Sequence, residues 1–114
     1  MRIEDYRFGS IRINGRTYRN DVKIVNDAVK PEWWRKTGHL VRREDLSDLL
    51  ETGPEIIVLG KGSPGQMVPE TGLAEDLEKE GIRLIARPTA EAVAEFNRLH
   101  GENRHVAAGF HLTC

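Results

Sequence analysis

The sequence has one cysteine, a formal net charge of only −1 and no long apolar run, and each shortage excludes a class of protein. Cys114 has no second cysteine for an internal disulfide, which favours a reducing, cytoplasmic location. Lys and Arg total 17 against 18 Asp and Glu, so the cation surplus of a nucleic-acid-coating protein is missing. No stretch approaches the roughly 18 apolar residues of a membrane helix, and the N-terminus lacks a signal-peptide core. We therefore expect no nucleic-acid partner and no membrane.

The composition is that of one globular domain. Hydrophobic residues make up 39% of the 114 residues and charged residues 31%, which predicts a normal core under a strongly ionic surface. The chain shows no internal repeat, low-complexity tract or linker. We expect a single domain over residues 1–114, present as a monomer or weak homo-oligomer.

The N-terminal quarter has the pattern of strands. Ile11 and Ile13 alternate with Arg12, and Asn14-Gly15 follows where a type I′ turn needs two residues with positive φ. This pattern predicts a β-hairpin over about 10–19 and a further strand over 21–25. Residues 26–39, which contain two tryptophans, are expected to form a long irregular connection.

From residue 43 onward, helices and strands are expected to alternate. Leu46, Leu49 and Leu50 form the apolar stripe of a short helix, and the apolar run 56–59 is typical of a strand buried on both faces. A second helix is predicted from about residue 70 to 80, with Pro69 in its first turn and Gly81 at its end. The remaining predictions are a strand over 82–86, a helix capped by Thr89 and ending at Gly101, and a strand over 105–112.

This order predicts an α/β (mixed α+β) fold. Helical crossovers between successive strands imply a parallel core with right-handed connections. In the last strand, Ala107 and Gly109 share one face, and their small size favours close approach of another layer. We expect a three-layer β/β/α arrangement with a mixed, partly parallel central sheet, α-β-α-β-α-β in the C-terminal two-thirds, and an N-terminal β-hairpin layer.

Four segments in this order resemble the Mth-domain family: Tyr6-Arg7-Phe8-Gly9 with the hairpin and Asp21-Val22, Trp34 with Gly38-His39, the apolar strand leading into Gly60-Lys61-Gly62, and Val106 to Cys114. The family includes the adipogenesis-associated Mth-domain-containing protein of mammals and a mitochondrial respiratory complex I assembly factor, and its founding member is an uncharacterised methanogen protein. The resemblance covers nearly the whole chain. It implies a single α/β domain with β/β/α layering, no established activity for prokaryotic members, and assembly or signalling roles with protein partners in eukaryotes.

The glycine-rich loop 60–65 matches G-x-G-x-x-G and follows a predicted buried strand. Dinucleotide binding is disfavoured because Pro64 removes a donor, Arg87 stands where an acidic ribose ligand belongs, and the chain has no room for a second nucleotide half. Two interpretations remain. Backbone N–H groups of Gly60, Gly62, Ser63 and Gly65, with the cation of Lys61, could form an anion-binding nest, or the loop could only reverse the chain.

Two tryptophans, an arginine and a histidine lie close together in the predicted connection. Trp33, Trp34, Arg35 and His39 are of the types that anchor interfaces and line pockets. The alternative is that one tryptophan only fills the edge of the core. Because adjacent residues rarely both become buried, we expect Trp34 to pack inward and Trp33 to be the more exposed.

The remaining reactive side chains give no metal or catalytic signature. His105 and His111 share a strand face but are separated by about 20 Å, too far to ligate one ion. Cys114 is a poor nucleophile candidate because a terminal residue is hard to hold in place. We expect no metal site and no cofactor.

Two functions remain. The first is a non-catalytic protein-binding or assembly module that uses the glycine-rich loop and the Trp34/His39 segment. The second is a small-ligand or anion-binding protein, or a small enzyme, with a pocket at the carboxyl ends of the parallel strands and His39 or His111 as general base. The missing catalytic motif and the implied roles of the eukaryotic relatives favour the first. The corresponding partner is a protein or a small anionic ligand.

Overall fold

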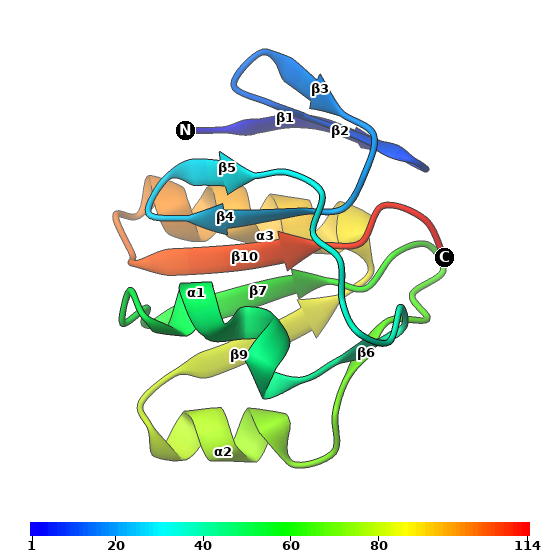
Figure 1. The fold of residues 1–114 in the computed structure, drawn as a ribbon. Coiled ribbons are helices and arrows are strands. Elements are labelled where there is room, and N and C mark those ends of the chain that lie inside the picture. Colours follow the sequence, from blue (N-terminus) through cyan, green and yellow to red (C-terminus); the bar gives the residue numbers. More distant parts are fainter.

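Five strands form the central sheet of the computed structural model, which describes residues 1–114. Across the sheet these are β5 (Ala28–Lys30), β4 (Val22–Val25), β10 (Val106–Phe110), β7 (Ile56–Gly60) and β9 (Arg83–Arg87) (Figure 1). β7 pairs in parallel with both β9 and β10, whereas β4 pairs antiparallel with both β10 and β5. The expected mixed, partly parallel sheet is confirmed.

Helices lie on both faces of this sheet (Figure 1). One face carries α3 (Thr89–Gly101), and the other carries α1 (Ser47–Leu50), the preceding 3-10 turn η1 (Arg43–Leu46) and α2 (Leu73–Lys79). The side chains of β7 alternate accordingly, with Ile56 and Val58 under α3 and Ile57 and Leu59 under the other helices. None of these helices combines the length and apolar composition needed to cross a lipid bilayer.

A separate antiparallel sheet forms the N-terminal layer. It consists of β1 (Ile3–Arg7), β2 (Ser10–Ile13) and β3 (Arg16–Tyr18). Asn14 and Gly15 have φ values of 49° and 81°, as a type I′ turn requires, and Ile13 pairs with Arg16 across that turn. The predicted hairpin is therefore confirmed.

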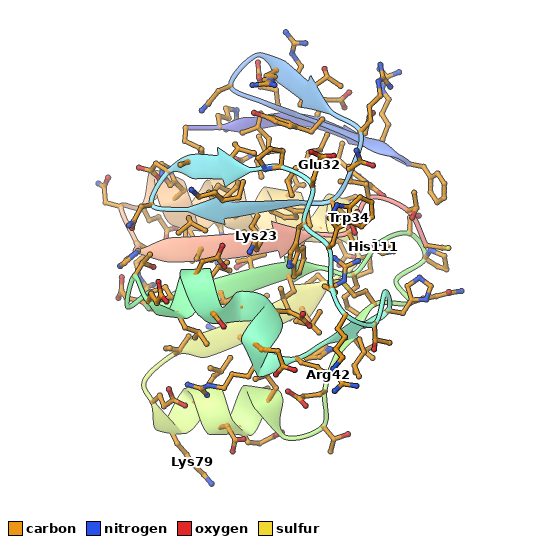
Figure 2. The ribbon with its side chains drawn as sticks, in the orientation of Figure 1. Lys23, Glu32, Trp34, Arg42, Lys79 and His111 are labelled. Atoms are coloured by element: carbon orange, nitrogen blue, oxygen red, sulfur yellow. The ribbon has the colours of Figure 1, made fainter.

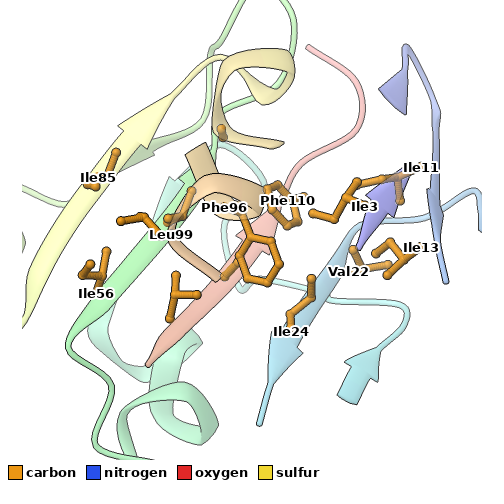
Figure 3. Close-up of a cluster of buried hydrophobic side chains, with 14 of the residues drawn as sticks. Ile3, Ile11, Ile13, Val22, Ile24, Ile56, Ile85, Phe96, Leu99 and Phe110 are labelled. Atoms are coloured by element: carbon orange, nitrogen blue, oxygen red, sulfur yellow. The ribbon is translucent and has the colours of Figure 1, made fainter. Parts of the chain in front are cut away.

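The N-terminal layer and α3 share one hydrophobic cluster. Figure 3 shows Ile3, Ile11 and Ile13 converging with Phe96 of α3 and Phe110 of β10. The two phenyl rings meet edge to face, with centroids 6.2 Å apart at 84°. Each of these buried side chains stabilises the fold by about 1.5–3 kcal/mol. The small sheet is thus held against the same core as the central sheet.

The connection between residues 26 and 39 is more regular than the sequence predicted. Asn26 and Asp27 have φ values of 48° and 61°, and they join β4 to β5 in a second tight hairpin. The prediction of an irregular segment over 26–39 is therefore wrong for its first part. Asn and Asp tolerate left-handed backbone better than other non-glycine residues, but the pair lacks the glycine that marked the first hairpin.

Two predicted helix starts are also corrected. α2 begins at Leu73 rather than near residue 70, because β8 (Val68–Pro69) pairs with β6 (Leu40–Val41). Thr89 does not cap α3, since Pro88 occupies the cap position. The Thr89 hydroxyl instead donates to the carbonyl of His111 at 2.6 Å and accepts the Gly62 N–H at 2.8 Å. Tertiary contacts therefore took precedence over local capping.

The exposure of the two tryptophans is the reverse of the sequence prediction. Trp33 is 4% exposed and Trp34 is 75% exposed. The Trp33 ring lies against Gly109 of β10, where an added Cβ would come within 2.6 Å of it. The expected close approach on this face of β10 is thus found, but it is made by Trp33 of the connecting segment. The N-terminal layer packs on the opposite face, with Ala108 and Phe110.

This contact predicts that Gly109→Ala lowers the free energy of unfolding by about 1–3 kcal/mol, because the added methyl group forces the Trp33 ring away from β10. Urea denaturation measures the change. Gly101→Ala is the matched control, since a Cβ there meets no atom within 4 Å. Equal stability changes for the two variants would contradict the predicted contact.

Candidate functional site

Four of the ten predicted site residues come together at the end of β10. Trp34, Arg35, His39 and His111 line a hollow of about 280 Å³, and Trp34 and His111 are labelled in Figure 2. We call this space the Asp21 hollow. Its other lining residues are Arg19, Asn20, Asp21, Gly38, Leu112 and Thr113.

Asp21 is the centre of the polar contacts in this hollow. Its Oδ2 accepts hydrogen bonds from Arg35 Nη2 at 2.7 Å and from His111 Nδ1 at 2.8 Å. Its Oδ1 accepts the Leu112 N–H at 2.9 Å, and its own carbonyl accepts the Trp33 N–H at 2.8 Å. Asp21, the residue that precedes β4, thus binds two other parts of the chain.

These bonds determine the charge state of Asp21. Burial acts to raise the pKa of this carboxyl group, but the hydrogen bonds from His111, Arg35 and the Leu112 N–H outweigh burial and hold the pKa below its ordinary value. Asp21 is therefore an anion at neutral pH. Nearby, burial and the Asp21 charge raise the pKa of Tyr6, whose hydroxyl donates to the Leu112 carbonyl at 2.9 Å.

The Arg35 guanidinium is held on three sides. Its side chain is 4% exposed, and its central carbon lies 4.5 Å from the centroid of the Trp33 ring. Nη2 donates to Asp21, and Nε donates to the Gly38 carbonyl at 2.9 Å. Nη1 is buried without a hydrogen-bond partner. The cation is thus fixed in place with one nitrogen unused.

His111 is fixed through both its main chain and its ring. Its N–H donates to the Gly60 carbonyl at 2.9 Å. Because a carboxylate only accepts, the bond to Asp21 places a proton on Nδ1. Nε2 is buried without a partner, and the ring of His39 meets that of His111 edge-on at 5.4 Å.

The glycine-rich loop does not line the Asp21 hollow. The N–H groups of Lys61, Gly62 and Ser63 donate to Arg87 O, Thr89 Oγ1 and Thr113 O, each at 2.8 Å. A Cβ at Gly62 would lie 2.2 Å from the Thr113 carbonyl oxygen. The residues Gly60, Lys61, Gly62, Ser63 and Gly65 therefore belong to a loop that packs against residues 111–114. Of the two interpretations left open, these contacts favour a structural turn over an anion-binding nest.

The Asp21–His111 pair has the geometry by which a carboxylate orients an imidazole for acid–base chemistry. No hydroxyl or thiol is hydrogen-bonded to His111 Nε2, so the structure shows no nucleophile paired with this base. No group of three or more His, Cys, Asp and Glu side chains is placed to hold a metal ion. The Asp21–Arg35–His111 cluster therefore holds a buried ion pair and an oriented imidazole.

Sequence reasoning missed Asp21, Arg19 and Asn20. Asp21 stood only as the first residue of a predicted strand, and nothing in its local sequence connects it to positions 35 and 111. The one available signal was its place in the segment that carries the resemblance to the Mth-domain family.

Replacing Asp21 by Asn is predicted to lower the free energy of unfolding at pH 7 by about 3 kcal/mol, because Arg35 loses its buried counter-charge. The lowered pKa of Asp21 stabilises the folded state above the ordinary carboxyl range near pH 4, and this contribution disappears as the pH falls through the lowered value. The variant should therefore lose less stability on acidification than the wild type. Urea denaturation at a series of pH values measures both effects.

Asp76→Asn is the matched control for that experiment, because Asp76 is exposed on α2 and makes no ion pair. Its stability should change by less than about 0.5 kcal/mol. An acid slope for Asp21→Asn as steep as that of the wild type would contradict the assigned role of Asp21.

Comparisons with known proteins agree with this architecture. The solved structure named MT938 is 31% identical, with a TM-score of 0.83 over 99% of this chain and 98% of that one. The conserved hypothetical protein PH1505 from Pyrococcus horikoshii OT3 is 24% identical, with a TM-score of 0.88 over the full length of both chains. A Bordetella pertussis protein described as a Mth938-like domain is 18% identical, with a TM-score of 0.65 over 97% of this chain and 85% of that one. The last two show the shared fold.

The 31% identity to MT938 over nearly the whole chain and the family match over residues 3–111 confirm the resemblance to the Mth-domain family. Residues 3–111 match the family described as a protein of unknown function, DUF498/DUF598. The matched residues include all strands and helices of the fold. The chain belongs to the DUF498/DUF598 family.

Proposed function

We propose that this protein is a non-catalytic recognition module that binds a protein partner through the face around Trp34. The observation that carries this proposal is the 75% exposure of a tryptophan on a segment whose neighbours are fixed. Trp33 is buried on one side of it and Arg35 on the other, and both bond to Asp21. Large aromatic side chains presented by a rigid frame are the usual anchors of protein interfaces.

The charges around Trp34 define the chemistry of the partner. Arg19 and His39 line the same hollow, and Lys36 is exposed two residues further along the chain. Arg19 and Lys36 have no acidic partner within the chain. A complementary surface therefore offers an apolar pocket for the indole, bordered by acidic side chains.

The resemblance to a family that includes an assembly factor supports a partner-binding role over an enzymatic one. The burial of His111 Nε2 supports the same choice, because a general base must reach a substrate or a water molecule. The protein is proposed to act in the cytoplasm, where its lone Cys114 stays reduced.

We also propose that the chain acts as a monomer or weak homo-oligomer. The two edges of the central sheet are β5 and β9. β5 is short and carries Lys30, while β9 carries the exposed Arg83 and Arg87. Two copies of β9 paired antiparallel about Ile85 would place these arginines opposite each other, which disfavours edge-to-edge association.

The test compares proteins retained from an extract of the organism that makes this protein. Wild type and Phe8→Ala should retain the same partner, whereas Trp34→Ala should lose most of it, because the indole is the proposed anchor. Phe8 is the matched control, as a 63% exposed aromatic residue that does not line the Asp21 hollow. Quantitative mass spectrometry of the retained proteins, repeated with the purified partner, gives the measurement. Retention by Trp34→Ala equal to that of the wild type would refute the proposed face.

A further inference from the structure

We infer that the outer edge of β9 binds an extended, acidic segment of a partner protein as an added β-strand. No residue of β9 lines the Asp21 hollow, so this surface is separate from the face around Trp34 and the inference goes beyond the proposed function. It depends on the free backbone groups of the edge, on two arginines without acidic partners, and on an adjoining hollow.

β9 has a strand neighbour on one side only. It is the last strand of the central sheet and pairs with β7 alone (Figure 1). The Arg83 N–H donates to the Glu55 carbonyl at 3.0 Å, which places the backbone groups of Arg83 on the side of β7. Because backbone groups alternate in direction along a strand, those of Leu84 and Ala86 face away from β7. A further strand would pair with these groups.

The free side of this edge is accessible. Leu84 and Ala86 are both partly exposed, and neither N–H donates to a carbonyl of a turn or loop. Arg83 and Leu84 line a hollow of about 560 Å³ that is open to solvent. The Ala86 carbonyl accepts Nη1 of the exposed Arg87 at 3.0 Å, and its second lone pair remains available. An approaching strand therefore finds both donors and acceptors.

The charges on this edge define an acidic occupant. Ile85 packs in the cluster under α3, so Arg83 and Arg87 lie on the same face of the strand, and both are exposed. Neither arginine forms an ion pair within the chain. Directly opposite residues of paired strands share a face, so two acidic residues four positions apart would meet the two arginines. The charges that disfavour pairing of two β9 strands favour this segment.

The hollow beside the edge adds a side-chain preference. Ala74 and Glu78 of α2 form one wall, and Ile82 and Leu84 form another. Leu84 packs on the α2 face of the sheet, so a residue added opposite Leu84 directs its side chain toward this hollow. In strand addition, main-chain bonds give affinity and such pockets give specificity. An apolar side chain suits this position, because Glu78 repels an acidic one.

The test is an NMR titration of the purified ¹⁵N-labelled chain with the end-blocked peptide Thr-Glu-Val-Thr-Phe-Glu-Thr. In antiparallel register its two acidic residues lie opposite Arg87 and Arg83, and its aromatic residue lies opposite Leu84. Saturable shift changes are expected at residues 83–87. The Leu84 and Ala86 amide protons should move downfield, because these N–H groups gain hydrogen bonds. Absence of saturable shifts at these residues would overturn the inference.

Two altered peptides separate strand addition from charge attraction. N-methyl groups on the valine and phenylalanine keep the peptide charges but remove the N–H groups that pair with β9, so binding should weaken about tenfold or more. Replacing both glutamates by lysine should weaken binding at least about fivefold, because the ion pairs with the arginines are lost. An N-methylated peptide that binds as tightly as its parent would refute strand addition.

Variants of the chain test the position of the site. The double variant Arg83→Gln/Arg87→Gln should weaken binding of the parent peptide at least about fivefold. The matched control is Arg16→Gln/Arg19→Gln, which removes two exposed arginines far from β9 in the sheet arrangement, and it should bind as the wild type does. All four side chains are exposed, so each variant is expected to fold. Equal weakening by the two double variants would show nonspecific attraction and overturn the site.

This experiment requires no natural partner, so its outcome is independent of the retention test for Trp34. Trp34→Ala should bind the peptide as the wild type does, because Trp34 does not line the hollow beside β9. A chain that loses its natural partner on Trp34→Ala but gives no saturable shifts with the peptide would keep the proposed function and lose the β9 site.

Discussion

The carboxylate of Asp21 is the interaction on which this end of the molecule depends. It accepts hydrogen bonds from Arg35, His111 and the Leu112 N–H, and these donors come from segments that are far apart in the sequence. Without this anion, nothing in the protein would balance the buried guanidinium. The segment that carries Trp34 and the chain after β10 are both fixed relative to β4 by one side chain.

This constraint explains why adjacent tryptophans differ so strongly. The Trp33 ring contacts Gly109 of β10, and the Arg35 guanidinium lies over the same ring. The hydrogen bond from the Trp33 N–H to the Asp21 carbonyl fixes the backbone at this point. Once Trp33 faces the sheet, the next side chain must face away from it. The exposure of Trp34 therefore follows from the burial of Trp33. The contacts that hold Trp33 also hold the backbone from which the exposed indole of Trp34 projects.

The sequence predicted features that depend on local patterns. Asn14 and Gly15 both tolerate positive φ, so the pair predicts a type I′ turn by itself. The apolar run of β7 likewise predicts a strand covered on both faces. The order of the two tryptophans could not be predicted, because it depends on a glycine in a strand about 75 residues further along the chain. Asp21 was missed for the same reason. The glycine-rich loop was ambiguous because the acceptors of its N–H groups, on Arg87, Thr89 and Thr113, are far from it in the sequence.

The position of β10 has a consequence for the order in which the protein folds. β4 and β7 have no contact with each other in the sheet until residues 106–110 insert between them. During synthesis, the β4–β5 hairpin and the β7–β9 pair emerge from the ribosome before β10, so β4 and β7 each lack the strand that lies between them in the complete sheet. Assembly is therefore a late, long-range event. The same segment that closes the sheet also delivers His111 to Asp21, so the hollow forms only in chains whose sheet is complete.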